Sequence, residues 1–151
     1  MTLNEEFLEW ELSIPKEISQ DALWHSTAYR MGLFVSDRCR PDLDPLVTDP
    51  RTSHAATQLG KALESISTNY AEGYSRSTIA DRTRFYEYAL GSARESRDWC
   101  FKLRRRLGQP LCDELLAFLT RITQLLTVTI VRERSRSSKR LQRRSPTDVD
   151  A

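Results

Sequence analysis

Two runs of sequence decide the fold: SISTNYAEGYSR at residues 65–76 and RFYEYALGSARESRDWCFKLRRRLG at residues 84–108. In the second run, apolar and small side chains recur at spacings of four, three, four, three and four. These residues are Phe85, Ala89, Ser92, Ser96, Trp99 and Leu103. The spacing places them on one face of an α-helix, because a strand would need a spacing of two.

Local signals indicate where the two helices begin and end. Gly73 ends the first, because glycine adopts the left-handed conformation that follows many helix C-termini. Thr78 and Asp81 have the spacing of a capping box and so indicate the start of the second. We therefore expect helices at about 53–74 and about 78–106.

A last helix is expected at about 111–133, after a turn at Gly108 and Pro110. It carries two adjacent apolar stripes, one starting at Leu111 and the other at Cys112. A helix in a monomeric bundle needs about three apolar positions in seven, and this helix has more. The surplus predicts a subunit interface, and a helix covered by the N-terminal residues is the alternative. We assign the interface to Leu116, Leu119, Leu126 and Ile130.

The N-terminal part of the chain is expected to hold an arm, a helix and a loop. Residues 1–16 form an acidic and aromatic arm whose pattern fits either a short amphipathic helix or an extended segment. The arm either folds onto its own bundle or docks on a neighbour or partner. The bundle is expected at 17–131, with its first helix at about 19–38. Residues 40–52 contain three prolines and three aspartates, which predicts a loop.

The signature resembles that of the bacterial four-helix bundle proteins encoded in intervening sequences of large-subunit rRNA genes. Tyr70 stands where that family usually has isoleucine. The resemblance covers residues 20–131 and implies an all-α, antiparallel up-down four-helix bundle that assembles into a ring-shaped homopentamer. The sequence also resembles the accessory variability determinants of diversity-generating retroelements. That resemblance implies nucleic acid and a reverse transcriptase as partners. The matching residues are Ser65, Ile66, Asn69, Ala71, Glu72, Gly73, Arg76, Gly91, Ser92 and Glu95.

Composition places the chain among soluble globular proteins. Its 151 residues suit one domain, and 39% hydrophobic with 29% charged residues is ordinary for this class. The acidic N-terminus differs from a secretory signal, and no run reaches the ~20 uncharged apolar residues of a membrane span. We therefore expect a cytoplasmic protein with no membrane partner. Cys39, Cys100 and Cys112 are odd in number and lack C-x-x-C spacing, which predicts buried thiols.

The sequence contains no G-x-S-x-G, no phosphate-binding glycine loop and no H-E-x-x-H. Neither His25 nor His54 follows a glutamate by three residues, which excludes the di-iron site of some helical bundles. We therefore expect no enzymatic activity, no catalytic or metal-binding residues, no cofactor and no small-molecule substrate. One polar cluster is expected to form a structural network that fixes the helical junction. Its members are Asn69, Glu72, Gly73, Arg76, Ser92 and Glu95.

Positive charge is concentrated at the C-terminus. Residues 1–131 carry 16 Lys and Arg against 18 Asp and Glu, whereas residues 132–151 carry 7 against 3. Such a segment cannot bury a core, so we expect residues 132–151 to be disordered, or helical only where they prolong the last helix. Basic charge of this density suits phosphates. The predicted nucleic-acid-binding residues are Arg104, Arg105, Arg106, Arg132, Arg134, Arg136, Lys139, Arg140, Arg143 and Arg144.

Two classes of function are consistent with the sequence. The first is a non-catalytic, homopentameric scaffold that binds RNA or an RNA/DNA hybrid through its basic residues and assists a reverse transcriptase. The second is a protein–protein adaptor ring that recruits a client through its N-terminal arm or its bundle surface.

Overall fold

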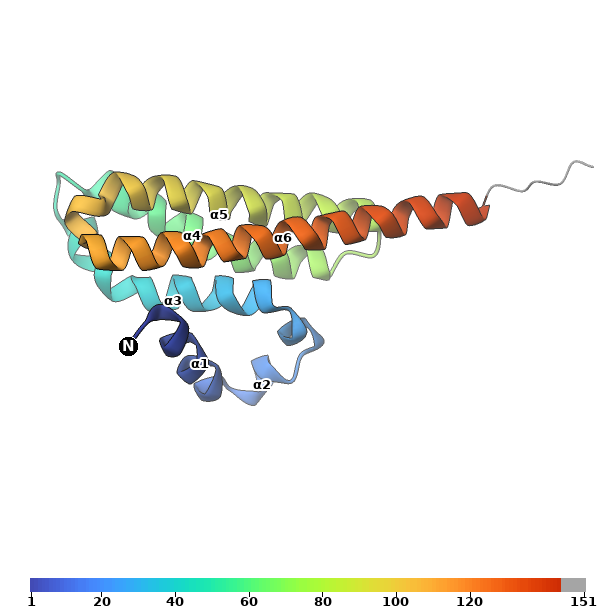
Figure 1. The fold of residues 1–151 in the computed structure, drawn as a ribbon, viewed down its shortest axis with the longest axis horizontal. Helices are drawn as coiled ribbons and strands as arrows, with labels where there is room; N and C mark the ends of the chain where they lie inside the picture. The colour runs from blue at the N-terminus through green and yellow to red at the C-terminus, as the bar shows by residue number, and fades with distance from the viewer. Residues whose placement is uncertain (145–151) are drawn as a thin grey trace, which may run out of the picture.

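The computed structural model describes residues 1–144, and in this range the chain is all-helical, as the sequence predicted. Four long helices lie side by side, and the last of them projects beyond the others at its C-terminal end (Figure 1). The elements in chain order are α1 (Leu3–Ser13), α2 (Lys16–Ser19), the 3-10 helix η1 (Ala22–His25), α3 (Thr27–Thr48), α4 (Ser53–Tyr74), α5 (Ile79–Leu107) and α6 (Gln109–Arg144).

The core lies between α3, α4, α5 and α6. The most extensive packing joins α4 to α5, α5 to α6 and α3 to α4, and α3 also contacts α6. Short connections link these helices, and the last is a single residue, Gly108, with φ +88°. Only glycine adopts this backbone conformation without strain. The largest fully buried apolar side chains are Met31, Phe34, Leu59, Leu63, Ile66, Leu119, Ile122 and Leu126.

The helix expected at 19–38 and the loop expected at 40–52 are wrong. The helix begins at Thr27, capped by Ser26, and continues through Pro41 and Pro45 to Thr48. Both prolines are exposed, so the hydrogen bonds they cannot donate are missing on the solvent side of the helix. Burial of Leu43 on the opposite side favours the continued helix. Local composition indicated a loop, but tertiary packing outweighs it.

The N-terminal arm is a helix that packs on its own chain. Phe7 is buried, with its ring centroid 5.3 Å from that of Phe34 in α3 and 5.8 Å from that of Phe118 in α6. Trp10 Nε1 donates a 2.8 Å hydrogen bond to Asp37. Of the alternatives left open by the sequence, the structure therefore has the helix, folded onto α3 and α6 (Figure 1).

This contact corrects the interface assigned on α6. Leu119 and Leu126 have no exposed surface, and Ile130 is 4% exposed, so these three residues belong to the core of the chain itself. Leu116 is half-buried against the same core. The apolar surplus of α6 is absorbed by packing on α5, α3 and α1. These positions are therefore covered within the chain itself, mostly by α5, and the N-terminal residues cover only a small part of α6.

By length and composition alone, α6 could also cross a membrane, and within residues 1–144 it is the one helix with this property. The core helix of a soluble protein passes the same test, so this is weak evidence. Here the apolar side chains of α6 that meet α5 and α3 are buried in the protein core.

The three cysteines are buried free thiols. Cys100 Sγ lies 3.4 Å from Cys112 Sγ at the end where α5 turns into α6. Burial raises the pKa of Cys39 to about 12 and also raises the pKa of Cys100, because a thiolate loses its hydration inside the core. Cys39 and Cys100 are therefore protonated packing residues at neutral pH.

Candidate nucleic-acid interface

The basic segment at residues 132–144, called the basic extension below, continues α6 as a helix to Arg144. Of the two alternatives expected for this segment, disorder and a prolonged last helix, the structure therefore has the prolonged helix as far as Arg144. Adding residues to an existing helix avoids the cost of nucleation, and Arg, Lys, Leu and Gln are good helix formers. Arg134 also pairs with Glu87 of α5, which ties the start of the extension to the core. The side chain of Arg144 and residues 145–151 lie outside the described part of the structure.

Four cations of the extension lie on one side of the helix, at positions i, i+3, i+4 and i+7. They form one wall of an open groove of about 390 Å³. The other wall comes from the turn between α4 and α5 and from the first turn of α5. The lining residues are Ser77, Ile79, Arg82, Arg136, Lys139, Arg140 and Arg143. We call this the basic groove, and five cations and no acid line it.

Helix starts add to the positive potential of this end of the molecule. Thr78 caps α5 beside the groove and accepts a 3.1 Å hydrogen bond from the Asp81 N–H, as the sequence predicted. A second groove, of about 380 Å³, lies at the start of α3 and is lined by Thr27, Arg132 and Arg136, among others. Helix N-termini carry a partial positive charge and free N–H donors. The basic groove therefore suits oxygen anions, whereas the second groove shares Arg136 with it but is also lined by the acid Glu133.

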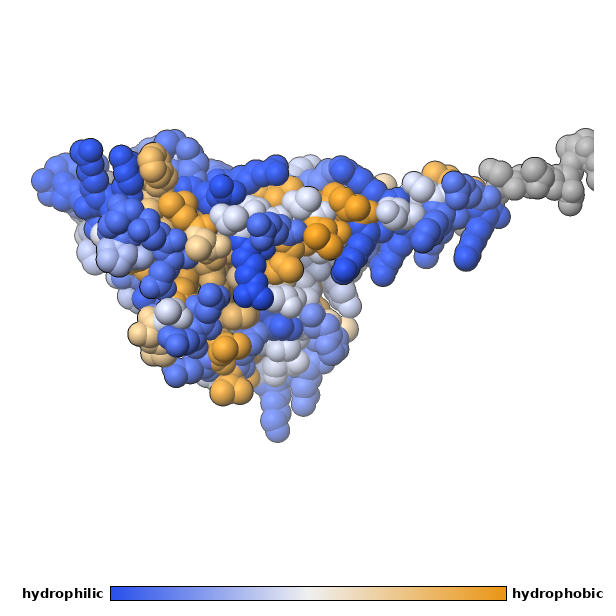
Figure 2. All heavy atoms as spheres, viewed as in Figure 1, coloured by the Kyte–Doolittle hydropathy of each residue, from blue (hydrophilic) through white to orange (hydrophobic). Residues whose placement is uncertain are grey.

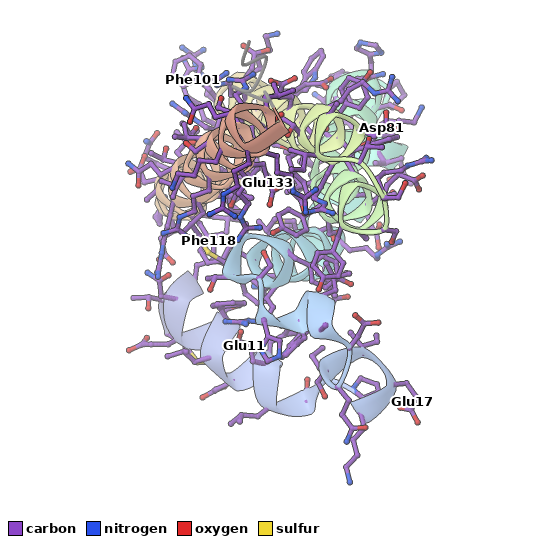
Figure 3. The ribbon with its side chains drawn as sticks, turned by 90° about the vertical axis from the view of Figure 1, so that its right-hand side faces the viewer. Glu11, Glu17, Asp81, Phe101, Phe118 and Glu133 are labelled. Atoms are coloured by element: carbon purple, nitrogen blue, oxygen red, sulfur yellow. The ribbon has the colours of Figure 1, made fainter. Side chains whose placement is uncertain are left out.

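Glu133 holds two of the groove arginines in place. It is 7% exposed and accepts hydrogen bonds from Arg82 Nη1 at 3.3 Å and from Arg136 Nη1 at 3.1 Å. Figure 3 shows Glu133 in the interior of this end of the molecule, between α6 and the neighbouring helices. Arg82 Nη2 also donates to the Arg76 carbonyl oxygen at 3.3 Å, while Arg82 Nε is buried without an acceptor among the described residues. The pair with Glu133 thus orients Arg82, whose side chain is 25% exposed, whereas the Arg136 side chain is 67% exposed.

The structure separates the two basic regions that the sequence grouped together. Arg104, Arg105 and Arg106 lie in the last turn of α5, at the opposite end of the four long helices from the basic extension (Figure 1). The 24 residues from Gln109 to Arg132 span about 35 Å along α6. The guanidinium of Arg104 lies over the Phe101 ring, 4.1 Å from its centroid. One phosphate cannot touch both regions.

Of the polar network expected from the signature, the described residues form only the pair between Arg76 and Glu72. Arg76 pairs with Glu72 one turn earlier, and its guanidinium lies 4.8 Å from the centroid of the Phe85 ring. Asn69 Nδ2 instead donates to the Ser65 carbonyl oxygen at 2.9 Å. Glu95 lies about 24 Å along α5 from the first residue of that helix, so it cannot reach Arg76.

Local hydrogen bonds replace that network. Glu95 accepts a 3.3 Å hydrogen bond from Trp99 Nε1. Ser92 Oγ donates to the Tyr88 carbonyl oxygen at 3.0 Å. Because the Arg76 and Glu72 side chains are 43% and 49% exposed, removing either leaves no buried charge, and we expect little effect on stability.

Gly73 is the signature residue on which close helix packing depends. A β-carbon here would lie 2.9 Å from Phe85 Cβ and 3.0 Å from the Arg82 carbonyl oxygen. We expect Gly73→Ala to lower the free energy of unfolding by about 1–3 kcal/mol through overpacking of α4 on α5. Gly91 is the matched control, because a β-carbon there meets no atom within 4 Å. Gly91→Ala should raise stability by about 1 kcal/mol through helix propensity.

Urea denaturation of both glycine variants would measure these changes. If Gly73→Ala were as stable as the parent, α4 and α5 would not approach this closely.

Several groove residues were missed by the sequence analysis. Ser77, Ile79 and Arg82 lie far along the chain from the basic extension, and only the fold brings them to it. Glu133 was counted as one acid within a basic run. Its pairing with Arg136 could have been recognised, because Glu133 lies three residues before Arg136 on the same helix. Among the described residues, no group of three or more His, Cys, Asp or Glu could hold a metal ion.

An all-helical fold with an elongated last helix defines the structural class of this protein. The model of the 23S rRNA-intervening sequence protein family matches residues 48–128, and the chain belongs to this family. A crystal structure of a protein of unknown function from the S23 ribosomal protein family of Bacteroides thetaiotaomicron VPI-5482 is similar, with a TM-score of 0.64 and 22% identity. The match covers 69% of this chain and 98% of that one, and it supports the fold alone. No curated protein matches the chain.

Proposed function

We propose that this protein is a non-catalytic nucleic-acid-binding scaffold that holds the phosphates of RNA at the basic groove. The observation that carries the proposal is the convergence of Arg136, Lys139, Arg140 and Arg143 on Arg82 across that groove. In the described residues, Lys139, Arg140 and Arg143 have no acidic partner, so their charge is available to a ligand. Arginine and lysine in this arrangement bind phosphate oxygens through charge-assisted hydrogen bonds.

We expect little sequence preference in this binding. The residues that line the basic groove include no aromatic ring on which a base could stack. Contacts to phosphates carry no direct sequence information. The RNA would therefore be held by its backbone, with its bases turned away from the groove.

The proposed protomer is an antiparallel up-down four-helix bundle, and the proposed assembly is a ring-shaped homopentamer. Family resemblance supports both. The apolar surface that the described chain leaves uncovered on α5 and α6 supports the assembly. Tyr88 and Phe101 of α5 are 51% and 54% exposed, and Val128 and Val131 of α6 are 48% and 55% exposed. Figure 2 shows hydrophobic residues gathered along this side of the molecule, next to the hydrophilic extension. The resemblance to accessory variability determinants makes a reverse transcriptase the proposed protein partner.

The salt dependence of RNA binding tests the proposal. We expect a quadruple variant, with Arg136, Lys139, Arg140 and Arg143 each changed to Gln, to lose most of its affinity for single-stranded RNA. Each phosphate contact contributes about 0.7 to the log–log salt slope, so the slope should become shallower by up to about 3. Glutamine keeps the helix propensity of the segment. Fluorescence anisotropy from 50 to 300 mM salt, roughly the range over which such binding falls steeply, would measure the slope.

The matched control replaces Arg104, Arg105 and Arg106 with Gln. This variant loses nearly as much charge at the opposite end of the four long helices, so its slope should stay close to that of the parent protein. Equal losses in both variants would indicate a diffuse electrostatic effect and contradict a site at the groove.

Adaptor activity is the second candidate function, and it is favoured by the outer surface of α1. Leu8 and Leu12 are 63% and 89% exposed there, beside the acidic residues Glu5 and Glu9. If the parent protein does not bind RNA even at low salt, this surface becomes the better candidate for a partner site.

A further inference from the structure

Four cations of the basic extension share the side of α6 that turns toward Arg82 and the start of α5, which restricts what they can bind. On the side of α6 that turns away from the basic groove, the described side chains are mostly uncharged. Its residues are Ser135, Ser137, Ser138, Leu141 and Gln142, together with Arg134, which is paired with Glu87. A helix that reads a duplex presents its cations outward to the nucleic-acid groove. This helix presents them to a corner of its own protein, and about 390 Å³ is the scale of a small ligand.

The charge in that corner exceeds what a single diester phosphate would neutralise. Glu133 is shared by Arg82 and Arg136, and three further cations have no acidic partner within residues 1–144. An internal phosphate of RNA carries one negative charge. A phosphate monoester carries about −1.5 to −2 at neutral pH and offers three terminal oxygens as acceptors.

Donors approach the corner from two elements. Arg136, Lys139, Arg140 and Arg143 come from α6, and Arg82 comes from α5 together with the cap region at Ser77. All five cations line one groove of about 390 Å³. The like-charged i,i+4 pairs Arg136/Arg140 and Lys139/Arg143 also repel each other when no anion is present. A multiply charged anion relieves that repulsion.

From these observations we propose that the basic groove receives the terminal phosphate monoester of an RNA strand. This inference rests on the proposed function, because it names the part of the RNA that the site recognises. Lys139, Arg140 and Arg143 supply the charge that the monoester requires, while Glu133 holds Arg82 and Arg136 so that they face it. The remainder of the strand leaves the groove past Arg136 toward the second groove, where Arg132 and the start of α3 lie.

The test compares two RNAs of one sequence, each labelled with fluorescein at the 3′ end. One carries a 5′-phosphate and the other a 5′-hydroxyl group. With the full chain at 150 mM salt, near physiological ionic strength, the phosphorylated RNA should bind about tenfold more tightly, as one or two added charge-assisted contacts imply. Arg140→Gln and Lys139→Gln should each reduce that preference several-fold. Arg105→Gln, at the far end of α5, should leave it unchanged.

Each outcome separates this inference from the proposed function. Equal, salt-dependent binding of both RNAs overturns the inference and leaves the proposed function in place. Failure of both RNAs to bind at low salt overturns both. A nucleoside monophosphate that competes at the same concentration as the phosphorylated RNA would make free nucleotides the ligand and would overturn the assignment to an RNA end. A preference that survives in the Lys139 and Arg140 variants would place the phosphate elsewhere.

Discussion

Leu126→Glu is expected to unfold the protein, whereas Val128→Glu, two residues along the same helix, is expected to keep the fold. Leu126 is completely buried and Val128 is 48% exposed. The first substitution removes a core side chain, which costs about 2–5 kcal/mol, and places a carboxylate where no cation can pair with it. Since domains of this size are stable by about 5–15 kcal/mol, such a change removes much or all of the stability.

Circular dichroism and urea denaturation would measure the difference between these variants. Val128→Glu should change the free energy of unfolding by less than about 1 kcal/mol, as expected for an exposed site. A stable, cooperatively folding Leu126→Glu protein would show that α6 does not pack as the structure has it.

A double variant built on Val128→Glu tests association separately from folding. If the ring uses the exposed apolar surface of α6, Val128→Glu combined with Val131→Glu should lower the mass measured by light scattering while helix content is retained. An assembled parent protein whose mass is unaffected by these changes would place the interface elsewhere. A parent protein that is monomeric at micromolar concentration would contradict the proposed ring.

Phe7→Ala is expected to cost about 3–5 kcal/mol of folding stability, the range for removal of a buried aromatic side chain. The ring of Phe7 contacts Phe34 of α3 and Phe118 of α6, so its loss leaves a cavity where three helices meet. Leu8→Ala is the matched control, because Leu8 is 63% exposed and should change stability by no more than about 0.5 kcal/mol. Thermal and urea denaturation of both variants would measure the difference.

If Phe7→Ala had the same melting temperature as the parent protein, α1 would not be docked on α3 and α6. In that case the apolar residues of α6 that α1 covers would be free for another partner, and the adaptor function would gain support.

Periodicity placed the two central helices, and capping placed the start of the second. The left-handed helix end expected at Gly73 is wrong, because Gly73 lies inside α4 and the positive-φ glycine of the described residues is Gly108. The α4 helix spans the residues expected for it, and α5 begins after Thr78, whose capping role followed from its spacing to Asp81. These features depend on residues within a few positions of one another, and short-range sequence records them directly. The concentration of positive charge after residue 131 is likewise a property of the sequence alone.

Whatever depends on distant residues was decided by the tertiary structure. The apolar stripes of α6 showed that two of its sides are buried, but an apolar side chain does not indicate whether its own chain or a second copy covers it. Most of that cover comes from α5, and α3 and α1 add smaller parts, with Phe7 of α1 meeting Phe118 from more than a hundred residues away. Packing around Leu43 carries α3 through two prolines that local composition assigned to a loop. The basic groove likewise exists only because the fold places Arg82 and Ser77 opposite the extension.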